Sequence, residues 1–193
     1  MKICIFGASS SRLDDIYYAE AEKAGRLIAQ RGHSMVFGAG REGVMGAAAR
    51  GAASAGGEII GIVPRFFDEP GVICDGCTQL IFTETLAERK RLMLESSDAC
   101  LALPGGLGTY EELFETMTMK QLWQNERAVV LVNTCGCYDA FEALMRDSVR
   151  RGFMSAGCLD LYTVCRTPEE ALRAIEGYVP RERNGRGLRD YSK

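Results

Sequence analysis

The sequence contains one histidine, one tryptophan and only five prolines among its 193 residues. The single histidine, His33, falls in a predicted turn between a helix and a strand, so a Ser-His-Asp hydrolase would lack its general base. No apolar run approaches the length needed to span a bilayer, and the N-terminus reaches glycine and serine too soon for a signal peptide. We therefore expect no membrane partner and a cytoplasmic protein.

A large excess of charge of either sign is also missing. The formal net charge is −3, which gives no electrostatic reason to expect a nucleic-acid partner. Charged residues make up 25% and hydrophobic residues 47% of the chain, as in an ordinary globular protein. The length suits one α/β domain, which we place at residues 1–180, followed by a basic, flexible tail at 181–193.

The eight cysteines come without a secretion signal, so we expect them to be reduced. Cys4 and Cys100 lie in strand-like runs, where free cysteine behaves as a small apolar residue. Cys74-Asp-Gly-Cys77 and Cys135-Gly-Cys137 could form a composite zinc site, but the second pair is spaced more tightly than usual zinc ligands. We therefore expect no metal ion.

The stretch from Leu101 to Glu115, LALPGGLGTYEELFE, carries the strongest functional signal. A strand-like run at 98–103 precedes it, and helical spacing begins after Thr109, so a glycine-rich turn joins a strand to a helix. Its glycines permit positive φ and let a ligand approach backbone N–H groups. The unpaired amides at a helix start favour an anion, for which phosphate is the natural candidate.

Thr109 and Glu112 also fit a capping box, in which each side chain satisfies a backbone donor of the other residue. Taken alone, capping is the simpler role for these two residues. However, a simple strand-to-helix turn needs fewer glycine and proline residues than precede Thr109 here. The pattern places Glu111 and Glu112 in the first turn of the helix.

A second glycine-rich stretch, GAGREGVMG at 38–46, follows a predicted strand and leads into an alanine-rich helix. Gly38, Gly40 and Gly43 have the spacing of the dinucleotide-binding fingerprint. That fingerprint normally follows the first strand, and an acidic residue ends the next strand about 20 residues on. Here the next strand, 58–63, has its only carboxylate at its start. A nicotinamide cofactor is therefore disfavoured, and we expect no cofactor.

The order of predicted elements indicates an α/β fold with a doubly wound, mainly parallel sheet and helices on both faces, a Rossmann-like architecture. The predicted strands are 2–6, 34–37, 58–63, 79–82, 98–103, 128–132 and 161–165. The predicted helices are 14–31, the alanine-rich helix that follows the 38–46 stretch and ends near 55, 84–96, 109–123, 138–150 and 168–176. Ligands collect at the carboxyl ends of such strands, so Ser9, in the polar turn after the first strand, is also a candidate site residue.

The predicted helix at 84–96 places Arg89 and Lys90 on either side of its inward-facing line, marked by Leu86 and Met93. Two cations that border an inward face need an anionic partner or a wet cleft. The alternative is that both side chains extend to the surface or form ordinary salt bridges.

PGGLGTYEE, residues 104–112, resembles the PGGxGTxxE motif of the LOG family, the cytokinin riboside 5′-monophosphate phosphoribohydrolases, formerly called lysine decarboxylases. The second glycine stretch is similar to the family's GGGxxGLMG motif, with Ala39 and Val44 as departures. Residues 61–64 are similar to its GVIP segment, residues 88–93 to its RKxxM element, and residues 133–139 to its LLNVxGFYD segment. Leu86 and Ala87 stand where the family often has Met-His. The resemblance covers about residues 1–175.

This resemblance implies a homodimeric enzyme that cleaves the N-glycosidic bond of AMP or of a cytokinin riboside 5′-monophosphate, giving the free base and ribose 5-phosphate. It implies catalytic roles for Glu112 and Arg89. The substrate- and phosphate-binding candidates are Ser9, Gly40, Gly43, Met45, Lys90, Gly105, Gly106, Leu107, Gly108, Thr109, Glu111 and Thr118. Apolar residues around Met117, Met119, Leu122 and Trp123 also favour a dimer, because they exceed one core-facing stripe.

A fixed carboxylate such as Glu112 can stabilise oxocarbenium character or orient water, and Arg89 can hold phosphate bidentately. Decarboxylation would need pyridoxal phosphate on a lysine, and Lys90, the least unsuited, has no convincing cofactor pocket around it. The remaining alternative is a non-catalytic nucleotide or cofactor carrier on the same fold. A carrier needs the phosphate cradle but not the carboxylate, so the pairing of Glu112 with Arg89 favours the enzyme.

Overall fold

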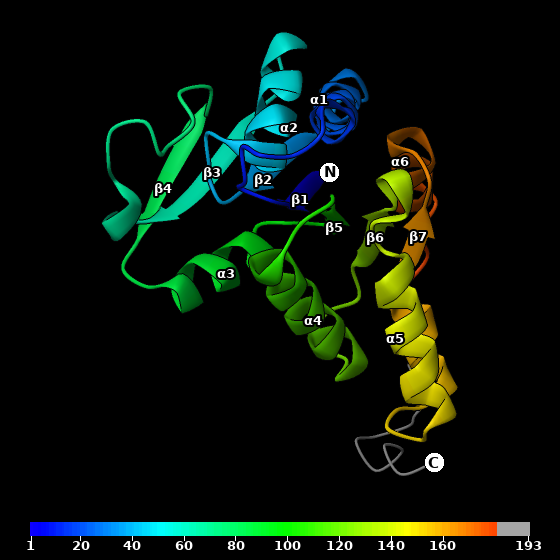
Figure 1. The fold of residues 1–193 in the computed structure, drawn as a ribbon. Helices are drawn as coiled ribbons and strands as arrows, with labels where there is room; N and C mark the ends of the chain where they lie inside the picture. The colour runs from blue at the N-terminus through cyan, green and yellow to red at the C-terminus, as the bar shows by residue number, and fades with distance from the viewer. Residues whose placement is uncertain (181–193) are drawn as a thin grey trace.

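A seven-stranded sheet forms the centre of the computed structural model, which describes residues 1–180 (Figure 1). The strands are β1 (Lys2–Phe6), β2 (Ser34–Phe37), β3 (Ile59–Pro64), β4 (Gln79–Thr83), β5 (Ala99–Ala102), β6 (Ala128–Val132) and β7 (Thr163–Cys165). Their order is β4-β3-β2-β1-β5-β6-β7, and every neighbouring pair is parallel. Within the described residues the sheet is therefore parallel throughout. The predicted tail, 181–193, lies outside these residues.

Helices cover both faces of the sheet, which confirms the doubly wound α/β architecture. They are α1 (Asp15–Gln30), α2 (Gly43–Ser54), α3 (Leu86–Glu95), α4 (Leu107–Gln121), α5 (Asp139–Arg150) and α6 (Pro168–Glu176). Helices α1, α2 and α6 pack on one face, and α3, α4 and α5 on the other (Figure 1). No helix in residues 1–180 is long and apolar enough to cross a membrane.

Strand β1 shows how the sequence divides the core into two layers. Ile3 and Ile5 pack with residues of α1, α2 and α6, whereas Cys4 and Phe6 pack with residues of α3, α4 and α5. Successive side chains of a strand point to opposite faces, and here both faces are covered. All four residues are therefore buried, which explains the unbroken apolar run in the sequence.

Glycines let α1 and α2 approach until their backbones touch. A Cβ on Gly25 of α1 would lie 1.8 Å from the carbonyl oxygen of Ala48, and a Cβ on Gly51 of α2 would lie 1.8 Å from that of Glu22. No larger residue fits at either position without moving a helix. The small residues of α2 therefore fix its place beside α1.

The chain reverses direction across the sheet at β1. It moves outward through β2, β3 and β4 and then returns to place β5 on the other side of β1. A crevice forms at the carboxyl ends of parallel strands where the order reverses. Both glycine-rich stretches, which follow β2 and β5, meet at this edge, as the sequence predicts.

Helix α4 begins two residues earlier than predicted, at Leu107, with Gly106 as its N-cap and no side chain capping it. Thr109 therefore lies inside the first turn, and the alternative of a Thr109–Glu112 capping box is wrong. Glu111 and Glu112 fall in the second turn. Met117, one of the apolar residues that favoured a dimer, packs in the core.

The two cysteine pairs are far apart in the fold. Cys74 and Cys77 precede the edge strand β4, whereas Cys135 and Cys137 follow β6 on the other side of β1. Among residues 1–180, no three His, Cys, Asp or Glu side chains gather where they could hold a metal ion. The composite zinc site considered from the sequence is therefore wrong.

Gly43 begins α2 with φ of 67°, and a Cβ there would lie 2.3 Å from the carbonyl oxygen of Ala8. Gly56 has a similar φ of 70°, but a Cβ there would meet no heavy atom within 4 Å. We expect Gly43→Ala to cost at least about 3 kcal/mol in unfolding free energy, against about 1 kcal/mol for Gly56→Ala. Urea unfolding followed by circular dichroism measures both. Equal losses would contradict the close contact between α2 and the loop after β1.

Candidate active site

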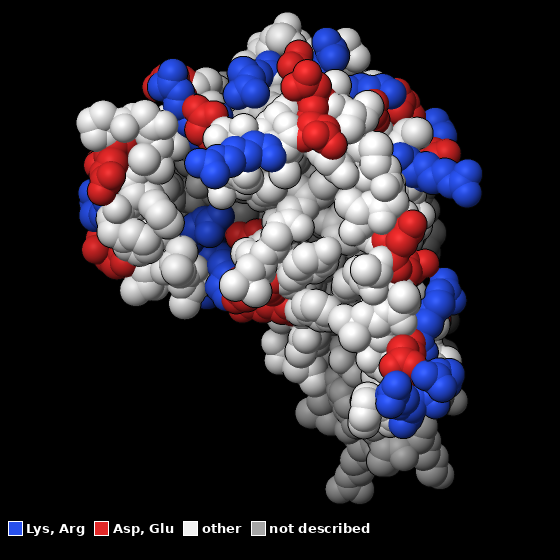
Figure 2. Space-filling model, viewed as in Figure 1, with Lys and Arg blue, Asp and Glu red and all other residues white. Residues whose placement is uncertain are grey.

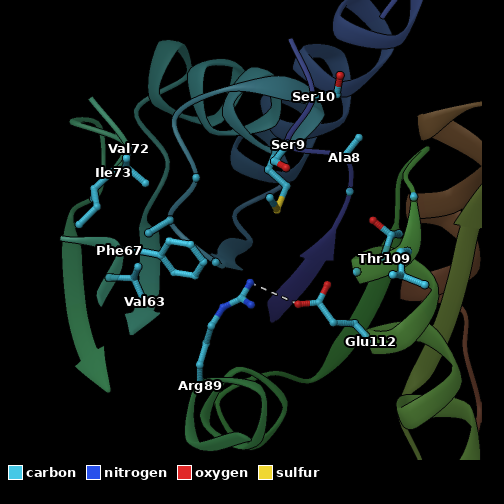
Figure 3. A pocket seen from close by; sticks show the side chains of 18 residues that line it. Ala8, Ser9, Ser10, Val63, Phe67, Val72, Ile73, Arg89, Thr109 and Glu112 are labelled. Carbon is cyan, nitrogen blue, oxygen red and sulfur yellow. Dashed lines mark ion pairs between the residues drawn. The ribbon is translucent and has the colours of Figure 1, made fainter. Parts of the chain in front are cut away.

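A cavity of about 470 Å³, the central cavity, lies at the carboxyl edge of the sheet. The loops after β1, β2, β3 and β5 form it, together with side chains from α3 and α4 (Figure 3). Figure 2 shows a hollow left of the centre of the viewed face, with basic and acidic atoms at its floor. A volume of this size is within the range of sites for small molecules.

Nine of the residues singled out from the sequence line the central cavity. They are Ser9, Gly40, Met45, Arg89, Gly106, Leu107, Gly108, Thr109 and Glu112. The remaining five candidates, Gly43, Lys90, Gly105, Glu111 and Thr118, lie outside its lining. The structure thus brings both glycine-rich stretches, the arginine and the carboxylate to one place.

The backbone of Ala8 ties three loops together at the floor of the central cavity. Its N–H donates to the carbonyl oxygen of Pro104 at 3.0 Å. Its carbonyl oxygen accepts from the N–H groups of Val44 at 2.8 Å and Met45 at 3.4 Å. The loop after β1 is therefore bonded to the turn after β5 and to the start of α2.

These bonds distinguish the two helix starts at the cavity. The amides of Val44 and Met45 are already engaged by Ala8, so the start of α2 has little left to offer a ligand. Gly106, Leu107 and Gly108, at the start of α4, are exposed at the cavity, and their amides have no acceptor in the described part of the chain. The start of α4 consequently has backbone donors that are free to receive an anion.

Two contacts, one from Thr109 and one from Tyr138, fix the shape of the turn before α4. A Cβ on Gly105 would lie 2.0 Å from the Oγ1 atom of Thr109, so the threonine side chain folds over a glycine that nothing larger could replace. The buried Tyr138 hydroxyl donates to the carbonyl oxygen of Leu103 at 2.7 Å. Gly105 and Tyr138 therefore act by shaping the turn rather than by lining the cavity.

Arg89 from α3 and Glu112 from α4 both line the central cavity and point towards each other (Figure 3). Arg89 Nη2 lies 3.2 Å from Glu112 Oε1, and the two side chains are only 15% and 10% exposed. The guanidinium rests over Gly38, where a Cβ would lie 2.0 Å from Nη2. Arg89 Nε is buried without a partner among the described residues, so the guanidinium retains a free donor.

Burial raises the pKa of Glu112 to about 7, and the nearby charge of Arg89 opposes this rise without cancelling it. The ion pair is therefore not strong enough to offset removal of the carboxylate from water. A carboxyl group with a pKa near neutrality can accept or release a proton at the working pH. This places an acid–base group at the cavity wall.

A second set of ion pairs joins α3 to α4 beside the first. Lys90 Nζ pairs with the carboxylates of Glu111 and Glu115, the latter at 2.8 Å. Lys90 and Glu111 are thus engaged with each other outside the central cavity, and Thr118 is exposed further along α4. Their arrangement fixes the spacing of the helices that carry Arg89 and Glu112.

The wall opposite Glu112 is apolar and was not predicted from the sequence. Val63 is the penultimate residue of β3, Phe67 belongs to a short 3-10 helix (Arg65–Phe67), and Val72 and Ile73 come from the following loop (Figure 3). Ile73 is held there by a backbone bridge to Gly40. No residue pattern in the 65–78 segment indicated which of its side chains face the cavity.

Ala39, a departure from the family's glycine, has φ of 58° and is buried. Its methyl group lies 2.9 Å from the position that a Cβ on Gly61 would occupy. Gly61 therefore provides the space that the extra methyl group needs, at the cost of a strained backbone at Ala39.

Together, the parallel sheet and the crevice at its point of reversal define a Rossmann-like protein, and the start of α4 presents unpaired amides to that crevice. Residues 45–175 match a family model described as "Possible lysine decarboxylase". The cytokinin riboside 5′-monophosphate phosphoribohydrolase LOG2 of Arabidopsis thaliana is 31% identical over 180 residues, covering 93% of this chain and 84% of that protein. The enzyme of the same name from Mycobacterium tuberculosis is 32% identical over 172 residues, covering 89% and 91%. The chain belongs to this LOG family.

Solved structures share the fold. The molybdenum cofactor carrier protein of Chlamydomonas reinhardtii is 26% identical with a TM-score of 0.68, covering 91% of this chain and 95% of that one. The molybdenum cofactor binding protein of Rippkaea orientalis is 22% identical with a TM-score of 0.67, covering 91% and 93%. The same architecture therefore occurs in proteins whose names describe carriers.

The raised pKa of Glu112 predicts a pH-dependent change in stability for Glu112→Gln. The folded-state pKa of about 7 exceeds the ordinary value of 4.5, so the group favours folding while protonated and this contribution is lost as pH rises through 7. At pH 8 the substitution removes a buried charge and should raise Tm by roughly 4–8 °C, a gain that shrinks towards pH 5. Calorimetry at both pH values measures it.

Glu95→Gln is the matched control, because Glu95 is 55% exposed and pairs with Arg91 on the same helix. Its Tm should change little at either pH. A destabilised Glu112→Gln at pH 8 would show that the carboxylate is not under strain.

Proposed function

We propose that this protein hydrolyses the N-glycosidic bond of a nucleoside 5′-monophosphate, AMP or a cytokinin riboside 5′-monophosphate, to the free base and ribose 5-phosphate. The observation that carries the proposal is the buried Glu112 carboxylate, which faces Arg89 between an anion-binding helix start and an apolar wall. The names of the related plant and mycobacterial proteins support the same reaction.

We place the phosphate at the start of α4. The amides of Gly106, Leu107 and Gly108 converge there with the positive end of the helix dipole, and Ser9 and Thr109 offer hydroxyl groups beside them. Gly40 and Met45 complete the cavity on the side of α2. Gly43 and Gly105 support the site indirectly, through the close contacts they permit.

The base then lies against the apolar wall. Phe67, Val72 and Ile73 offer a ring and aliphatic surface, which suits a flat aromatic base better than a charged group. With the phosphate at one end and the base at the other, the ribose spans the space beside Glu112. The anomeric carbon is thereby placed near the carboxylate.

Departure of the base leaves positive charge on the sugar ring, which a fixed carboxylate at Glu112 stabilises. Its pKa of about 7 also allows it to take a proton from the attacking water. Arg89 keeps the carboxylate oriented and has a free Nε–H for the phosphate or the departing group. Binding energy from the remote phosphate is used at the anomeric centre.

The decisive experiment incubates the protein with AMP and measures adenine and ribose 5-phosphate by chromatography. Adenosine, which leaves the phosphate cradle empty, should be a poor substrate, with kcat/KM at least about a hundredfold lower. Equal rates with AMP and adenosine would contradict the assignment of the cradle.

Substitutions at the ion pair should separate its two roles. Glu112→Gln keeps the shape but removes the charge, so kcat should fall about a hundredfold or more while AMP still binds. Arg89→Ala should lower kcat and raise KM, and Arg89→Lys should restore only part of the loss because the planar fork is gone. Glu95→Gln, distant from the cavity, should keep the wild-type kcat. An undiminished rate in Glu112→Gln would refute the catalytic role of the carboxylate.

A non-catalytic carrier is the second candidate, because the structural relatives include the Chlamydomonas carrier protein. A carrier would bind AMP or a larger phosphate-bearing cofactor stoichiometrically and release no base. The buried carboxylate favours the enzyme, since an anion carrier gains nothing from a negative charge in its cavity.

We also propose a homodimer in the cytoplasm. Phe114 on α4, Leu144 on α5 and Phe153 after α5 are exposed apolar side chains, and Phe153 is 80% exposed. Such residues are commonly covered by a partner. Light scattering after gel filtration at micromolar concentration should give twice the mass of the chain. A monomeric mass would contradict the dimer.

A further inference from the structure

The loop between β3 and β4 carries a cysteine pair for which the proposed reaction has no use. Cys74 and Cys77 flank Asp75 and Gly76, which form the centre of a turn. A β-turn holds its first and fourth Cα atoms within about 7 Å, which is the span that a disulfide bridges. Both thiols are free and partly buried.

The two sulfur atoms have different surroundings. Cys77 Sγ faces the sheet and lies 2.9 Å from the position of a Cβ on Gly61. Cys74 Sγ lies near the end of α2, since a Cβ on Gly76 would be 3.8 Å from both Cys74 Sγ and the methyl group of Ala53. The turn therefore presents one sulfur to the protein interior and the other towards α2.

A second cavity of about 280 Å³, here named the Cys74 cavity, opens between this turn and α2. Cys74 lines it together with Arg41, Glu42, Arg50 and Asp75, whereas Cys77 does not. A small molecule in the Cys74 cavity can thus contact Cys74 but not Cys77. This asymmetry is that of an attacking thiol and a resolving thiol.

Hydrogen bonds to the sulfur of Cys74 favour its thiolate. A hydrogen bond from the Cys77 thiol lowers the pKa of Cys74 to about 6, and a backbone hydrogen bond at Gly76 and the charge of Arg50 act in the same direction. Burial and Asp75 oppose this shift. Asp75 is itself paired with Arg41 at 2.9 Å, which reduces its effect. The same bond and burial raise the pKa of Cys77.

We propose that Cys74 and Cys77 form a thiol–disulfide exchange site for a low-molecular-weight disulfide that carries carboxylate groups. Arg41 and Arg50 border the Cys74 cavity, and guanidinium groups bind carboxylates well. Low-molecular-weight disulfides of this class include glutathione disulfide.

The exchange is balanced in two steps. The Cys74 thiolate attacks one sulfur of the small disulfide, whose S–S bond breaks, and one small thiolate leaves with a mixed disulfide remaining on Cys74. Cys77 then loses its proton to solvent and attacks the Cys74 sulfur, which expels the second small thiolate. The two cysteines give up two electrons in total, and the small disulfide is reduced to two thiols.

The exchange site adjoins the central cavity but is chemically separate from it. The N–H of Cys74 donates to the carbonyl oxygen of Ala39 at 2.9 Å, and neither cysteine lines the central cavity. The proposal therefore stands whether or not the protein hydrolyses nucleotides. Its test is chemical and needs no measurement of that activity.

The test treats the reduced full-length protein with glutathione disulfide at pH 7.5, quenches with iodoacetamide at intervals and analyses tryptic peptides by mass spectrometry. Cleavage after Arg65 and Arg89 gives a peptide, 66–89, whose only cysteines are Cys74 and Cys77. This peptide should lose two hydrogens and regain them after treatment with excess glutathione. A peptide that stays reduced in the wild-type protein would overturn the proposal.

Single substitutions assign the roles. Cys77→Ser should accumulate a glutathione adduct on Cys74, and Cys74→Ser should form its adduct on Cys77 at least about tenfold more slowly. Cys135→Ser, at the separate Cys135-Gly-Cys137 pair, should behave as the wild type. Equal adduct rates on Cys74 and Cys77 would refute Cys74 as the attacking thiol.

The pH profile gives a further measure. In Cys77→Ser the hydrogen bond from the resolving thiol is gone, so the profile is taken on the wild-type protein. Its initial rate of iodoacetamide labelling at Cys74 should level off above about pH 7, because the thiol is already ionised. A rate that keeps rising to pH 9, as for an ordinary thiol, would contradict the proposed environment of Cys74.

Discussion

The site depends on the main-chain hydrogen bonds of Ala8. Its N–H and carbonyl oxygen bond to Pro104, Val44 and Met45, so three loops that are distant in the sequence share one junction. Each loop brings glycines to the junction because the backbones approach more closely than side chains would allow. These contacts fix the position of the α4 start, whose amides have no acceptor among the described residues. The site is consequently built into the sheet rather than carried on independent loops.

Arg89 and Glu112 depend on a different support, the ion pairs that join α3 to α4. The pairs of Lys90 with Glu111 and Glu115 hold these helices together where water can reach them. This leaves the inner pair with little water and with a carboxylate whose charge is poorly compensated. The exposed ion pairs of Lys90 thus hold together two helices whose inner carboxylate, Glu112, is unfavourable to ionise. A positive charge developing on a bound substrate would stabilise that carboxylate.

The sequence predicted the sheet, its helices and half of the cavity lining, because apolar periodicity and glycine spacing are local signals. It did not predict the start of α4. Thr-x-x-Glu does mark a cap at α3, where Thr85 accepts from the Glu88 amide, and at α6, where Thr167 accepts from that of Glu170. The same pattern fails at Thr109 because glycines let the helix begin earlier. The apolar wall was not predicted either. The position of Phe67 depends on how the long segment between β3 and β4 packs against the residues that follow β2.

The contact between α1 and α2 has a consequence for motion. Gly25 and Gly51 bring these helices together backbone to backbone, and α2 is in turn bonded to the loop after β1. On this side of the crevice, α2 and the loop after β1 cannot move without breaking main-chain contacts. The 65–78 segment is also joined to this side through its backbone, since the N–H of Arg41 donates to the carbonyl oxygen of Val72 and the N–H of Cys74 donates to that of Ala39. Any widening of the crevice must therefore come from α3, which meets it through the side chain of Arg89.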